Sequence, residues 1–348
     1  MVTDSRQQQL TDWLRTTHVP PNGSVEMVSG DASFRRYFRF LHASQWFIAV
    51  DAPPPQESLQ PFMAIAQAYR EQGLHAPKVH AYEQQLGFMV LDDFGDTLLF
   101  QRLVDDAAAE QAYQQALGLL PGLMRVTKTT EGPLPAYDIA LLQRELSLFS
   151  DWLVQHHLGL ELNSEQHSIW HATCDSLIDN ALQQPQVGVH RDFHSRNLMW
   201  LESEEQIAVI DFQDAVQGPI TYDAVSLLRD CYVRWPDALV ARQVERFFQR
   251  LQAEQLLPSD TTLTQFIRWF DFMGIQRHLK AAGIFARLLH RDGKAGYMAD
   301  VPRTLGYIID ISAKYPELAS FSQWVSQVRE QFIAQPPTAD IIDPVSVT

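Results

Sequence analysis

The sequence has very little cysteine and no long apolar run. Its two cysteines, Cys174 and Cys231, lie far apart and without metal-ligand spacing, so we expect neither a disulfide framework nor a cysteine metal site. Two reduced thiols in the cytoplasm are the simpler interpretation. No segment reaches the roughly 20 apolar residues that a membrane-spanning helix needs. The first stretch, MVTDSRQQQLTDWL, has an early aspartate and no apolar core, so we expect no secretory signal peptide.

Positive charge is also scarce in this chain. Its 348 residues include 27 Lys and Arg against 42 Asp and Glu, which gives a formal net charge of −15. Nucleic acids and anionic membranes attract basic surfaces, so we expect neither as a partner. An anionic small molecule is compatible with this balance, because a local group of arginines can bind it inside an acidic protein. We therefore expect a cytoplasmic monomer that acts on small molecules.

The pattern of the chain changes near residue 93. Before this point, the runs VEMVSG, FRRYFRF and WFIAVDA have the composition of strands, and residues 77–95 read as a further strand pair. Apolar spacing predicts helices over residues 5–16 and 58–72. Helical periodicity then dominates, over residues 104–128, 138–158, 164–184, 222–233, 236–255, 260–291 and 316–334. The sequence predicts an α+β fold, with a small β-rich lobe over residues 1–93 and a large, mostly helical lobe over residues 94–348.

Imidazole, carboxylate and amide side chains gather in one short stretch, VHRDFHSRNLMWLESEEQIAVIDFQDA, at residues 189–215, which contains His190, Asp192, Asn197, Asp211 and Asp214. The runs NLMWL and QIAVID flank a polar turn and are expected to pair as an antiparallel hairpin. That pairing places Leu198 opposite Ile210 and Asn197 opposite Asp211, with Cβ atoms roughly 4.5–5.5 Å apart. An amide oxygen beside a carboxylate suits Mg²⁺, which takes one or two protein oxygens and completes its shell with water and phosphate.

The same stretch carries the residues that phosphoryl transfer to an alcohol requires. Asp192 precedes Asn197 by five residues, so it is expected to orient an acceptor hydroxyl and accept its proton. Asn197 and Asp211 are expected to hold the Mg²⁺ that bridges the nucleotide phosphates. His190 is interpreted as a structural residue of this loop. Each fragment alone is weak evidence for phosphoryl transfer, but the order H-R-D-x-x-x-x-N followed by I-D-F is a specific signal for it.

This order of motifs resembles the catalytic and metal loops of the protein-kinase-like superfamily. The variant Asp211-Phe212-Gln213 in place of D-F-G, the missing A-P-E segment and the many C-terminal helices resemble its small-molecule branch, the aminoglycoside phosphotransferases and choline kinases. The continuation GPITYDAVSLLRD is similar to that branch too, where Asp223 would brace the catalytic loop. The resemblance covers nearly the whole chain. It implies a bilobal protein-kinase-like fold, with ATP as co-substrate and Mg²⁺ as cofactor.

Two further stretches, SGDASFRRYFRF and FMGIQRHLKAAGIFARLLHRDGKAGYM, resemble the bacterial cell-wall-recycling sugar kinases. This likeness implies phosphorylation of the anomeric C1 hydroxyl of N-acetylmuramate or N-acetylglucosamine in peptidoglycan recycling. Two alternatives stay open. One is a kinase of the same fold that acts on an aminoglycoside or a choline-like alcohol. The other is a nucleotide-binding pseudokinase.

The lysine that this superfamily carries on its third strand is missing. The run that resembles V-A-I-K ends in Asp51, which cannot bind phosphate and which motivates the pseudokinase alternative. The loop SGDASFRR, at the place of the superfamily's glycine-rich loop, has Gly30 as its single glycine. Backbone amides near Gly30 and Ser33 are the expected phosphate contacts. The arginines that follow can supply the missing charge, and Arg forms a bidentate fork with phosphate. Arg35, Arg36 and Arg39 are the candidates, and we hypothesise that Arg35 or Arg36 replaces the lysine.

A second D-F-G occurs in DDFGDT at residues 92–97, but no catalytic loop precedes it. We interpret this segment as the connector between the lobes rather than as a metal site. Backbone groups of residues such as Val90 and Asp92 are expected to contact adenine.

Candidate acceptor-binding residues lie in two places. His194, Arg196 and Asp214 sit in or beside the catalytic and metal loops, where solvated or turn-capping roles are the alternatives. Three cations lie on the long helix predicted over residues 260–291, namely Arg277, His278 and Lys280. A cation there would suit the lactyl carboxylate of N-acetylmuramate, whereas salt bridges between helices are the alternative.

Overall fold

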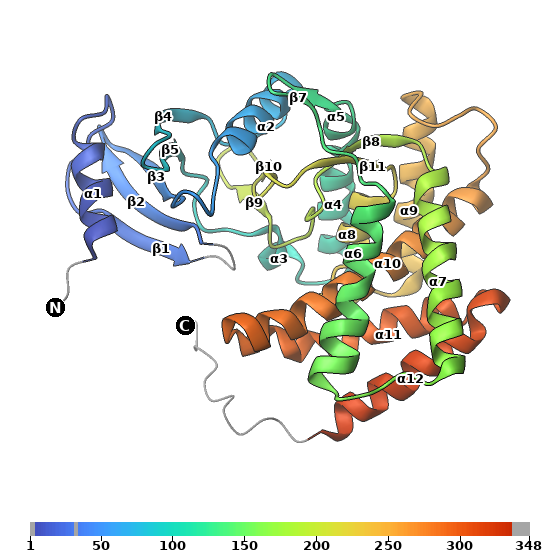
Figure 1. Ribbon diagram of the computed structural model, residues 1–348. Coiled ribbons are helices and arrows are strands. Elements are labelled where there is room, and N and C mark those ends of the chain that lie inside the picture. The colour runs from blue at the N-terminus through green and yellow to red at the C-terminus, as the bar shows by residue number, and fades with distance from the viewer. Residues whose placement is uncertain (1–3, 31–33, 336–348) are drawn as a thin grey trace. The chain divides into compact units, whose positions relative to one another are not determined.

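The computed structural model describes residues 4–30 and 34–335, so Ser33 lies outside the described part of the chain. Contacts within the chain divide it into two units: the first comprises residues 1–135 and 190–216, and the second residues 136–189 and 217–348. The β-rich N-terminal region and the mostly helical remainder (Figure 1) confirm the predicted α+β class. The boundary predicted at residue 93 marks the end of the N-terminal sheet, and as a domain boundary it stays a prediction.

The first unit contains a five-stranded antiparallel sheet with the strand order β1-β2-β3-β5-β4. Its strands are β1 (Glu26–Gly30), β2 (Arg36–His42), β3 (Gln45–Asp51), β4 (Val79–Glu83) and β5 (Phe88–Asp92). Ala43 and Ser44 join β2 to β3 with φ of 47° and 68°, the left-handed conformation of a tight hairpin turn. Helix α2 (Gln60–Glu71) lies between β3 and β4 in the sequence and has Pro61 in its first turn, where proline is tolerated. The strands and the helix predicted for this region are confirmed.

Successive side chains of this sheet point to opposite faces, because a strand has a period of two residues. On one face, Phe38 of β2 and Ala49 of β3 belong to an apolar core that they share with α1 (Ser5–Leu14). On the other face, Tyr37 of β2 and Ile48 of β3 line a cavity. Alternate residues of β2 and β3 therefore face the core against α1, and the residues between them face the cavity.

The remainder of the first unit holds short helices and the predicted hairpin. The strands of the hairpin are β9 (Leu198–Leu201) and β10 (Gln206–Val209). The other elements are α3 (Leu99–Arg102), α4 (Asp106–Leu117), α5 (Leu120–Met124), β6 (Lys128–Thr129) and β7 (Gly132–Pro133). The single helix predicted over residues 104–128 is therefore wrong: the chain divides it into α4, α5 and part of a strand. Bridges from His75 to Ala208 and from Leu98 to Met199 hold the hairpin in the unit.

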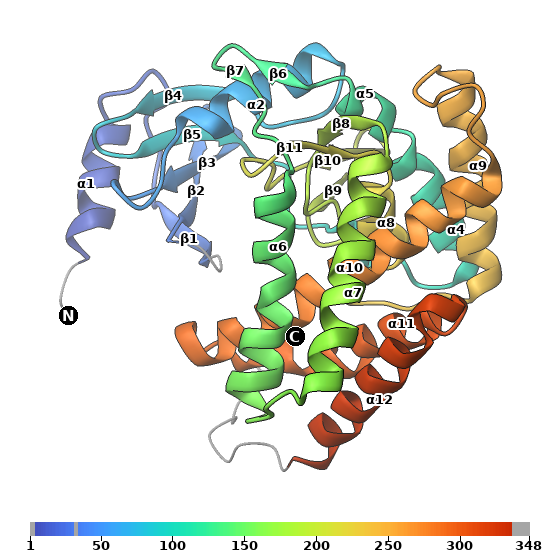
Figure 2. The same ribbon diagram turned by 45° about the vertical axis from the view of Figure 1, so that its right-hand side comes forward.

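The second unit is built mainly from helices around α10 (Leu263–Asp292). Its other helices are α6 (Ile139–Leu148), a π-helix (Phe149–His157), α7 (Ser164–Gln183), α8 (Tyr222–Leu228), α9 (Asp237–Ala253), a 3₁₀ helix (Ala295–Asp300), α11 (Val301–Ser312), a second 3₁₀ turn (Pro316–Leu318) and α12 (Ala319–Ala334). Strands β8 (Gln186–Val189) and β11 (Val216–Pro219) pair with each other. Figure 2 shows α6 and α7 side by side, with α10 in contact with both. Asp138 and Asn163 cap α6 and α7 through their side chains.

Two expectations about the chain as a whole can be compared with this structure. Both Cys174 and Cys231 are free thiols, as predicted. Across residues 4–30 and 34–335, none of the helices combines the length and the hydropathy of a membrane span.

Candidate active site

His190 joins the predicted catalytic loop to the segment that follows β10 and carries the predicted metal ligand Asp211. Its Nε2 donates to the carbonyl oxygen of Ile210 at 2.9 Å, and its Nδ1 accepts the backbone N–H of Asp192 at 3.3 Å. The side chain is fully buried, and burial lowers its pKa to about 4 against the opposing charge of Asp192. A neutral imidazole at pH 7 agrees with the structural role predicted for His190.

The hairpin pairs one residue away from the predicted register. Leu198 lies opposite Val209 rather than Ile210, because the turn closes between Leu201 and Gln206. Asn197 consequently meets Ile210 instead of Asp211, and its carbonyl oxygen accepts the N–H of Ile210 at 3.2 Å. The predicted pairing of Asn197 with Asp211 across the strands is therefore wrong.

The two predicted metal ligands nevertheless come together. Asp211 follows β10 with φ of 64°, and Nδ2 of Asn197 lies 3.2 Å from Oδ2 of Asp211. Aspartate tolerates this left-handed backbone better than most residues do. The same nitrogen of Asn197 donates to the carbonyl oxygen of Asp192 at 3.1 Å, which connects the metal ligands to the catalytic loop. The side chain of Asp192 is half-buried.

The donor set at Asn197 and Asp211 fits Mg²⁺. The amide nitrogen of Asn197 makes the contacts just described, so its Oδ1 is the atom that would face a cation, beside the carboxylate of Asp211. Gln213 Nε2 donates to Oδ1 of Asp211 at 2.9 Å and orients that carboxylate. Over the described residues, no three His, Cys, Asp or Glu side chains gather as a metal-binding group. Two protein oxygens completed by phosphates and water are the usual Mg²⁺ arrangement in nucleotide sites.

Phe212 anchors the metal loop to helix α2. Its ring is fully buried and stacks on Phe62 with centroids 4.8 Å apart, and it meets the edge of Tyr69 at 5.3 Å. Both partners lie on the buried face of α2. The position of Asp211 therefore depends on α2 as well as on the hairpin.

The two predicted metal ligands, Asn197 and Asp211, line a cavity of about 520 Å³ in the first unit. A volume of this size is typical of sites for small molecules and cofactors. Its apolar lining residues are Val28, Ile48, Phe62, Leu91, Phe94, Leu98, Met199 and Ile210. The polar side chain of Arg196 also lines it. Sequence patterns did not single out these apolar residues, although the alternation of β3 would have indicated Ile48.

The connector at residues 92–97 lines the same cavity, but Val90 does not. Val90 lies in the central strand β5 between Ala49 and Ala81, and its buried side chain packs in the core against α1. Val90 is not among the residues that line the cavity, and the predicted contact of its backbone with adenine stays a prediction. Asp92 does line the cavity, while its carboxylate accepts the backbone N–H of Lys78 at 2.8 Å and contacts Nε2 of His80 at 2.7 Å.

The carboxylates of the second D-F-G are bound by Arg39. Its guanidinium donates to Asp93 at 3.0 Å and to Asp96 at 2.8 Å. The hydrogen bond from Arg39 lowers the pKa of Asp96, and the same contact raises the pKa of Arg39. These ion pairs use the carboxylates that a metal would need, which supports the connector interpretation.

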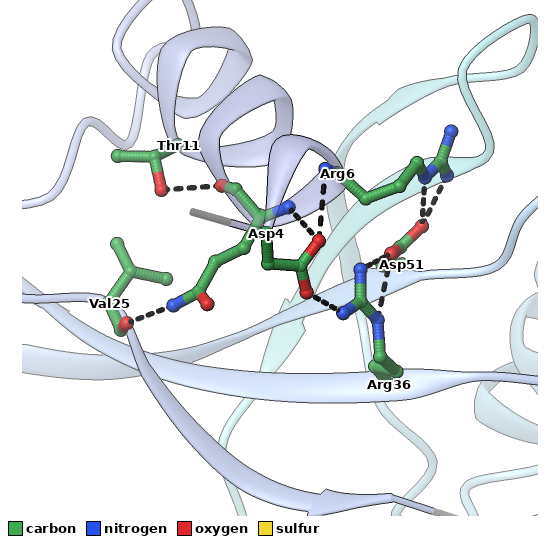
Figure 3. Close-up of polar contacts among 7 residues, drawn as sticks. Asp4, Arg6, Thr11, Val25, Arg36 and Asp51 are labelled. Atoms are coloured by element: carbon green, nitrogen blue, oxygen red, sulfur yellow. Dashed lines mark hydrogen bonds and ion pairs between the residues drawn. The ribbon is translucent and has the colours of Figure 1, made fainter. Parts of the chain in front are cut away.

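Asp51 belongs to the face of the sheet that packs against α1. Figure 3 shows its carboxylate between the guanidinium groups of Arg6 and Arg36. Arg36 Nη2 lies 2.6 Å from Oδ2, and Arg6 Nε lies 3.1 Å from Oδ1. The carboxylate is 1% exposed, and Asp4 binds the far side of Arg36.

The predictions for Asp51 of β3 and Arg36 of β2 are corrected here, because successive side chains of a strand point to opposite faces of the sheet. Ile48 faces the cavity, so the next residue of β3 on that face is Val50, not Asp51. Asp51 therefore does not occupy the position of the superfamily lysine. Arg36 pairs with Asp51 on the face opposite to the cavity, so it cannot contact a nucleotide there.

Two other predicted phosphate contacts lie near this strand pair. Arg35 directly precedes β2, and its Nη2 lies 2.7 Å from Oε2 of Glu57. Gly30 ends β1 opposite Arg36. Sequence reasoning missed Glu57, which no motif marks.

The predicted acceptor residues of the first unit lie beside the catalytic loop. The backbone N–H of His194 donates to the carbonyl oxygen of Asp192 at 3.0 Å, so this residue shapes the loop. Arg196 is exposed, and its guanidinium lies 5.1 Å from the ring centre of Phe100. Asp214 is exposed, and its carbonyl oxygen accepts from Arg191 at 3.3 Å.

The predicted acceptor residues of the second unit are buried in its interior. Lys280 Nζ lies 3.0 Å from the hydroxyl of Tyr222 and 3.3 Å from Oε1 of Glu145. Arg277 Nη1 lies 3.6 Å from Sγ of Cys231. Acceptor binding by these two cations stays a prediction.

His278 cannot serve as a cation for a carboxylate at neutral pH. Its Nε2 lies 2.9 Å from the carbonyl oxygen of Arg229, and its ring stacks on Tyr307. Burial, together with the charge of Arg277, lowers its pKa to about 3. The prediction that His278 offers a positive charge is therefore wrong.

The chain is similar in sequence and in fold to known proteins. A model of the phosphotransferase enzyme family matches residues 24–270. An N-acetylmuramate/N-acetylglucosamine kinase of Pseudomonas putida is 41% identical over 336 residues, which cover 94% of this chain and 97% of that protein. An ethanolamine kinase of Plasmodium vivax has a similar fold, with a TM-score of 0.59 at 11% identity over 81% of each chain.

A second solved structure is an aminoglycoside phosphotransferase in a ternary complex with AMP-PNP and hygromycin B. It has a TM-score of 0.53 at 15% identity, over 86% of this chain and 97% of that chain. These likenesses confirm the bilobal protein-kinase-like fold expected from the sequence.

Proposed function

The chain belongs to the phosphotransferase enzyme family, and on that premise we propose that it is a cytoplasmic kinase of N-acetylated amino sugars. The substrates would be ATP and N-acetylmuramate or N-acetylglucosamine, and the product would be the sugar 1-phosphate of peptidoglycan recycling. The observation that carries this proposal is the pair Asn197 and Asp211, held at 3.2 Å on a cavity beside the loop of Asp192. The 41% identity to an N-acetylmuramate/N-acetylglucosamine kinase supports the choice of acceptor.

Asp192 would orient the acceptor hydroxyl and take its proton as the new O–P bond forms to the γ-phosphorus and the bond from that phosphorus to ADP, the leaving group, breaks. The C1 hydroxyl of a sugar is more acidic than the ring hydroxyls, so a carboxylate suffices and positioning dominates catalysis. His190 would keep the loop of Asp192 in register with the end of β10 through its two hydrogen bonds. Bound to Asn197 and Asp211, Mg²⁺ would neutralise charge on the nucleotide phosphates.

The apolar lining of the cavity would bind the adenine and ribose of the nucleotide. Arg196 lines this cavity with Asn197, so phosphate is as suitable a partner for it as the acceptor. His194 and Asp214 would contact the sugar. A cation such as Arg277 or Lys280 would suit the lactyl carboxylate of N-acetylmuramate.

The pseudokinase alternative loses its motivation, because Asp51 lies on the face of the sheet opposite to the cavity. A kinase for a cationic acceptor remains the alternative to be tested by acceptor choice.

The test is nucleotide consumption with N-acetylmuramate, N-acetylglucosamine, kanamycin and choline, using wild type and Asp192→Asn. Turnover with the N-acetyl sugars that is lost in the variant is the expected result. Coupling of the product phosphorus to the anomeric proton in NMR spectra would place the phosphate on C1. Turnover with kanamycin or choline alone would overturn the substrate, and ATP binding without any turnover would favour the pseudokinase.

A further inference from the structure

Arg35 directly precedes β2, and the alternation along that strand predicts which side of the sheet it faces. Tyr37 and Arg39 line the cavity, whereas Arg36 and Phe38 face α1. Continuation of this alternation by one residue places Arg35 with the cavity-facing set. Two adjacent arginines of the sequence are thus directed to opposite sides of the sheet.

The guanidinium of Arg35 is buried and held by a carboxylate. Its Nη2 lies 2.7 Å from Oε2 of Glu57, and the two side chains are 7% and 14% exposed. Burial opposes its charge, but Tyr37 and the carboxylates of Glu57 and Asp211 raise its pKa above the ordinary value. Arg35 therefore stays protonated, and it is close enough to the metal-binding carboxylate Asp211 to sense its charge.

Glu57 connects this cation to the rest of the site. It lies three residues before α2, which begins at Gln60. Helix α2 in turn packs on Phe212, the neighbour of Asp211, through Phe62 and Tyr69. Arg35 is thus paired with a residue just before α2, while the neighbour of Asp211 packs on α2 itself.

Resting on the proposed kinase function, we propose that Arg35 is the cation that binds the nucleotide phosphates beside Asp211, and that Glu57 positions it. Val50 follows Ile48 on the same side of β3 and offers no charge, whereas Arg35 directly precedes β2, the strand paired with β3. An arginine presents five N–H groups in a planar fork, so one edge can bind Glu57 while the remaining donors bind phosphate oxygens.

The test measures the dissociation constants of ATP, ADP and adenosine by calorimetry, in Mg²⁺ and in EDTA, together with KM and kcat. Arg35→Ala should weaken ATP and ADP roughly 10- to 100-fold, the loss typical of one or two charge-assisted hydrogen bonds, and leave adenosine unchanged. The loss should persist in EDTA, because the contact does not depend on the metal. Arg35→Lys should restore part of the affinity.

Arg36→Lys is the matched control, since it preserves the charge that Asp51 needs on the other face of the sheet. It should leave all three dissociation constants unchanged. An equal effect of the Arg35 and Arg36 substitutions on ATP affinity would overturn the assignment.

The positioning role of Glu57 is tested by coupling. Glu57→Gln should weaken ADP binding in the wild-type background, and Glu57→Asp should recover part of it. In the Arg35→Ala background, Glu57→Gln should have no further effect on ADP affinity. Independent, multiplicative losses in the two variants would show that Glu57 does not act through Arg35.

This inference and the proposed function fail in different ways. If wild type neither binds nor consumes nucleotide, the kinase proposal is wrong. If wild type is an active kinase and folded Arg35→Ala binds ADP as tightly as wild type, only the role of Arg35 is wrong. Circular dichroism and the unfolding midpoint of each variant establish that it is folded.

Discussion

Asn197 and Asp211 meet at 3.2 Å although they are not opposite each other in the hairpin. Strand β10 ends at Val209, two residues before Asp211, and Asp211 has a positive φ. This backbone conformation directs the carboxylate of Asp211 toward the amide of Asn197. The geometry of the predicted metal site thus depends on a backbone conformation at one residue as much as on strand pairing. A conformation of this kind costs about 1–3 kcal/mol and persists only where its surroundings hold it.

Asp211→Asn should preserve the backbone and remove the charge. Asparagine tolerates positive φ as aspartate does, so the unfolding midpoint should change little. The affinity for ATP in Mg²⁺ should fall to the affinity that wild type shows in EDTA, and turnover should be lost. Calorimetric titration with and without Mg²⁺ checks this, and an undiminished Mg²⁺ effect would contradict the assignment of Asp211.

Asp51→Ala should destabilise the protein without weakening nucleotide binding. The substitution leaves Arg6 and Arg36 without their shared carboxylate, and hydrogen bonds to charged groups contribute about 1.5–3 kcal/mol. Urea unfolding should show a loss of that size, while KM for ATP in the folded protein stays within about twofold of wild type. A large rise of KM at unchanged stability would return Asp51 to the nucleotide site.

Acidification below about pH 6.5 should destabilise the fold through its buried histidines. His190 and His278 are neutral in the folded state, with pKa values lowered to about 4 and about 3 by burial. The unfolded chain binds their protons as pH falls through about 6.5, so the folded state loses free energy relative to it. Each histidine should contribute about 1.4 kcal/mol per pH unit below that value.

His278→Phe isolates one of these contributions. The ring stacking on Tyr307 can persist, while the titrating group is removed. The slope of unfolding free energy against pH between 5 and 6.5 should decrease by about 1 kcal/mol per unit, because the unfolded imidazole is half protonated at pH 6.5 and almost fully protonated at pH 5. Urea titrations at four pH values measure it, and an unaltered slope would contradict the neutral state of His278.

Gly283→Ala should destabilise the second unit. A Cβ added at Gly283 of α10 would lie 2.3 Å from the backbone of Leu148, at the junction of α6 with the π-helix. Backbone cannot rotate away as a side chain can, so a loss of about 1–3 kcal/mol is expected. Gly122→Ala is the control, because its Cβ would meet the side chain of Leu74 at 3.5 Å and the carbonyl oxygen of Gln72 at 3.7 Å, both ordinary contacts.

Much of the first unit could be predicted from the sequence because its signals are local. The strands, the helix at residues 60–71 and the order of Asp192, Asn197 and Asp211 follow from periodicity and spacing within short windows. The hairpin register was missed by one residue, since the position at which the turn closes cannot be read from a polar run. Asp51 was assigned to the wrong face for a similar reason, because a motif match ignores which side chains of a strand point the same way.

The second unit shows where tertiary structure overrides sequence pattern. The helix α11 was not predicted, because Pro302 and Gly306 weaken its propensity, yet proline is tolerated in the first turn. His278 looks like a cation in the sequence, and only its complete burial reveals that it is neutral. Glu57 lies in no motif, and its role depends on an arginine 22 positions earlier in the chain.

The alternation of β2 has a consequence for how this segment tolerates change. Residues 36, 38 and 40 serve the core against α1, whereas residues 37 and 39 line the cavity and Arg35 precedes them on the same side. A saturation library of residues 35–40 can be selected either for abundance of the protein or for growth on the sugar. Selection for abundance should deplete variants at residues 36, 38 and 40, and selection for growth should in addition deplete variants at residues 35, 37 and 39. Neighbouring positions in the gene would drift under different pressures, one for remaining folded and the other for remaining a catalyst.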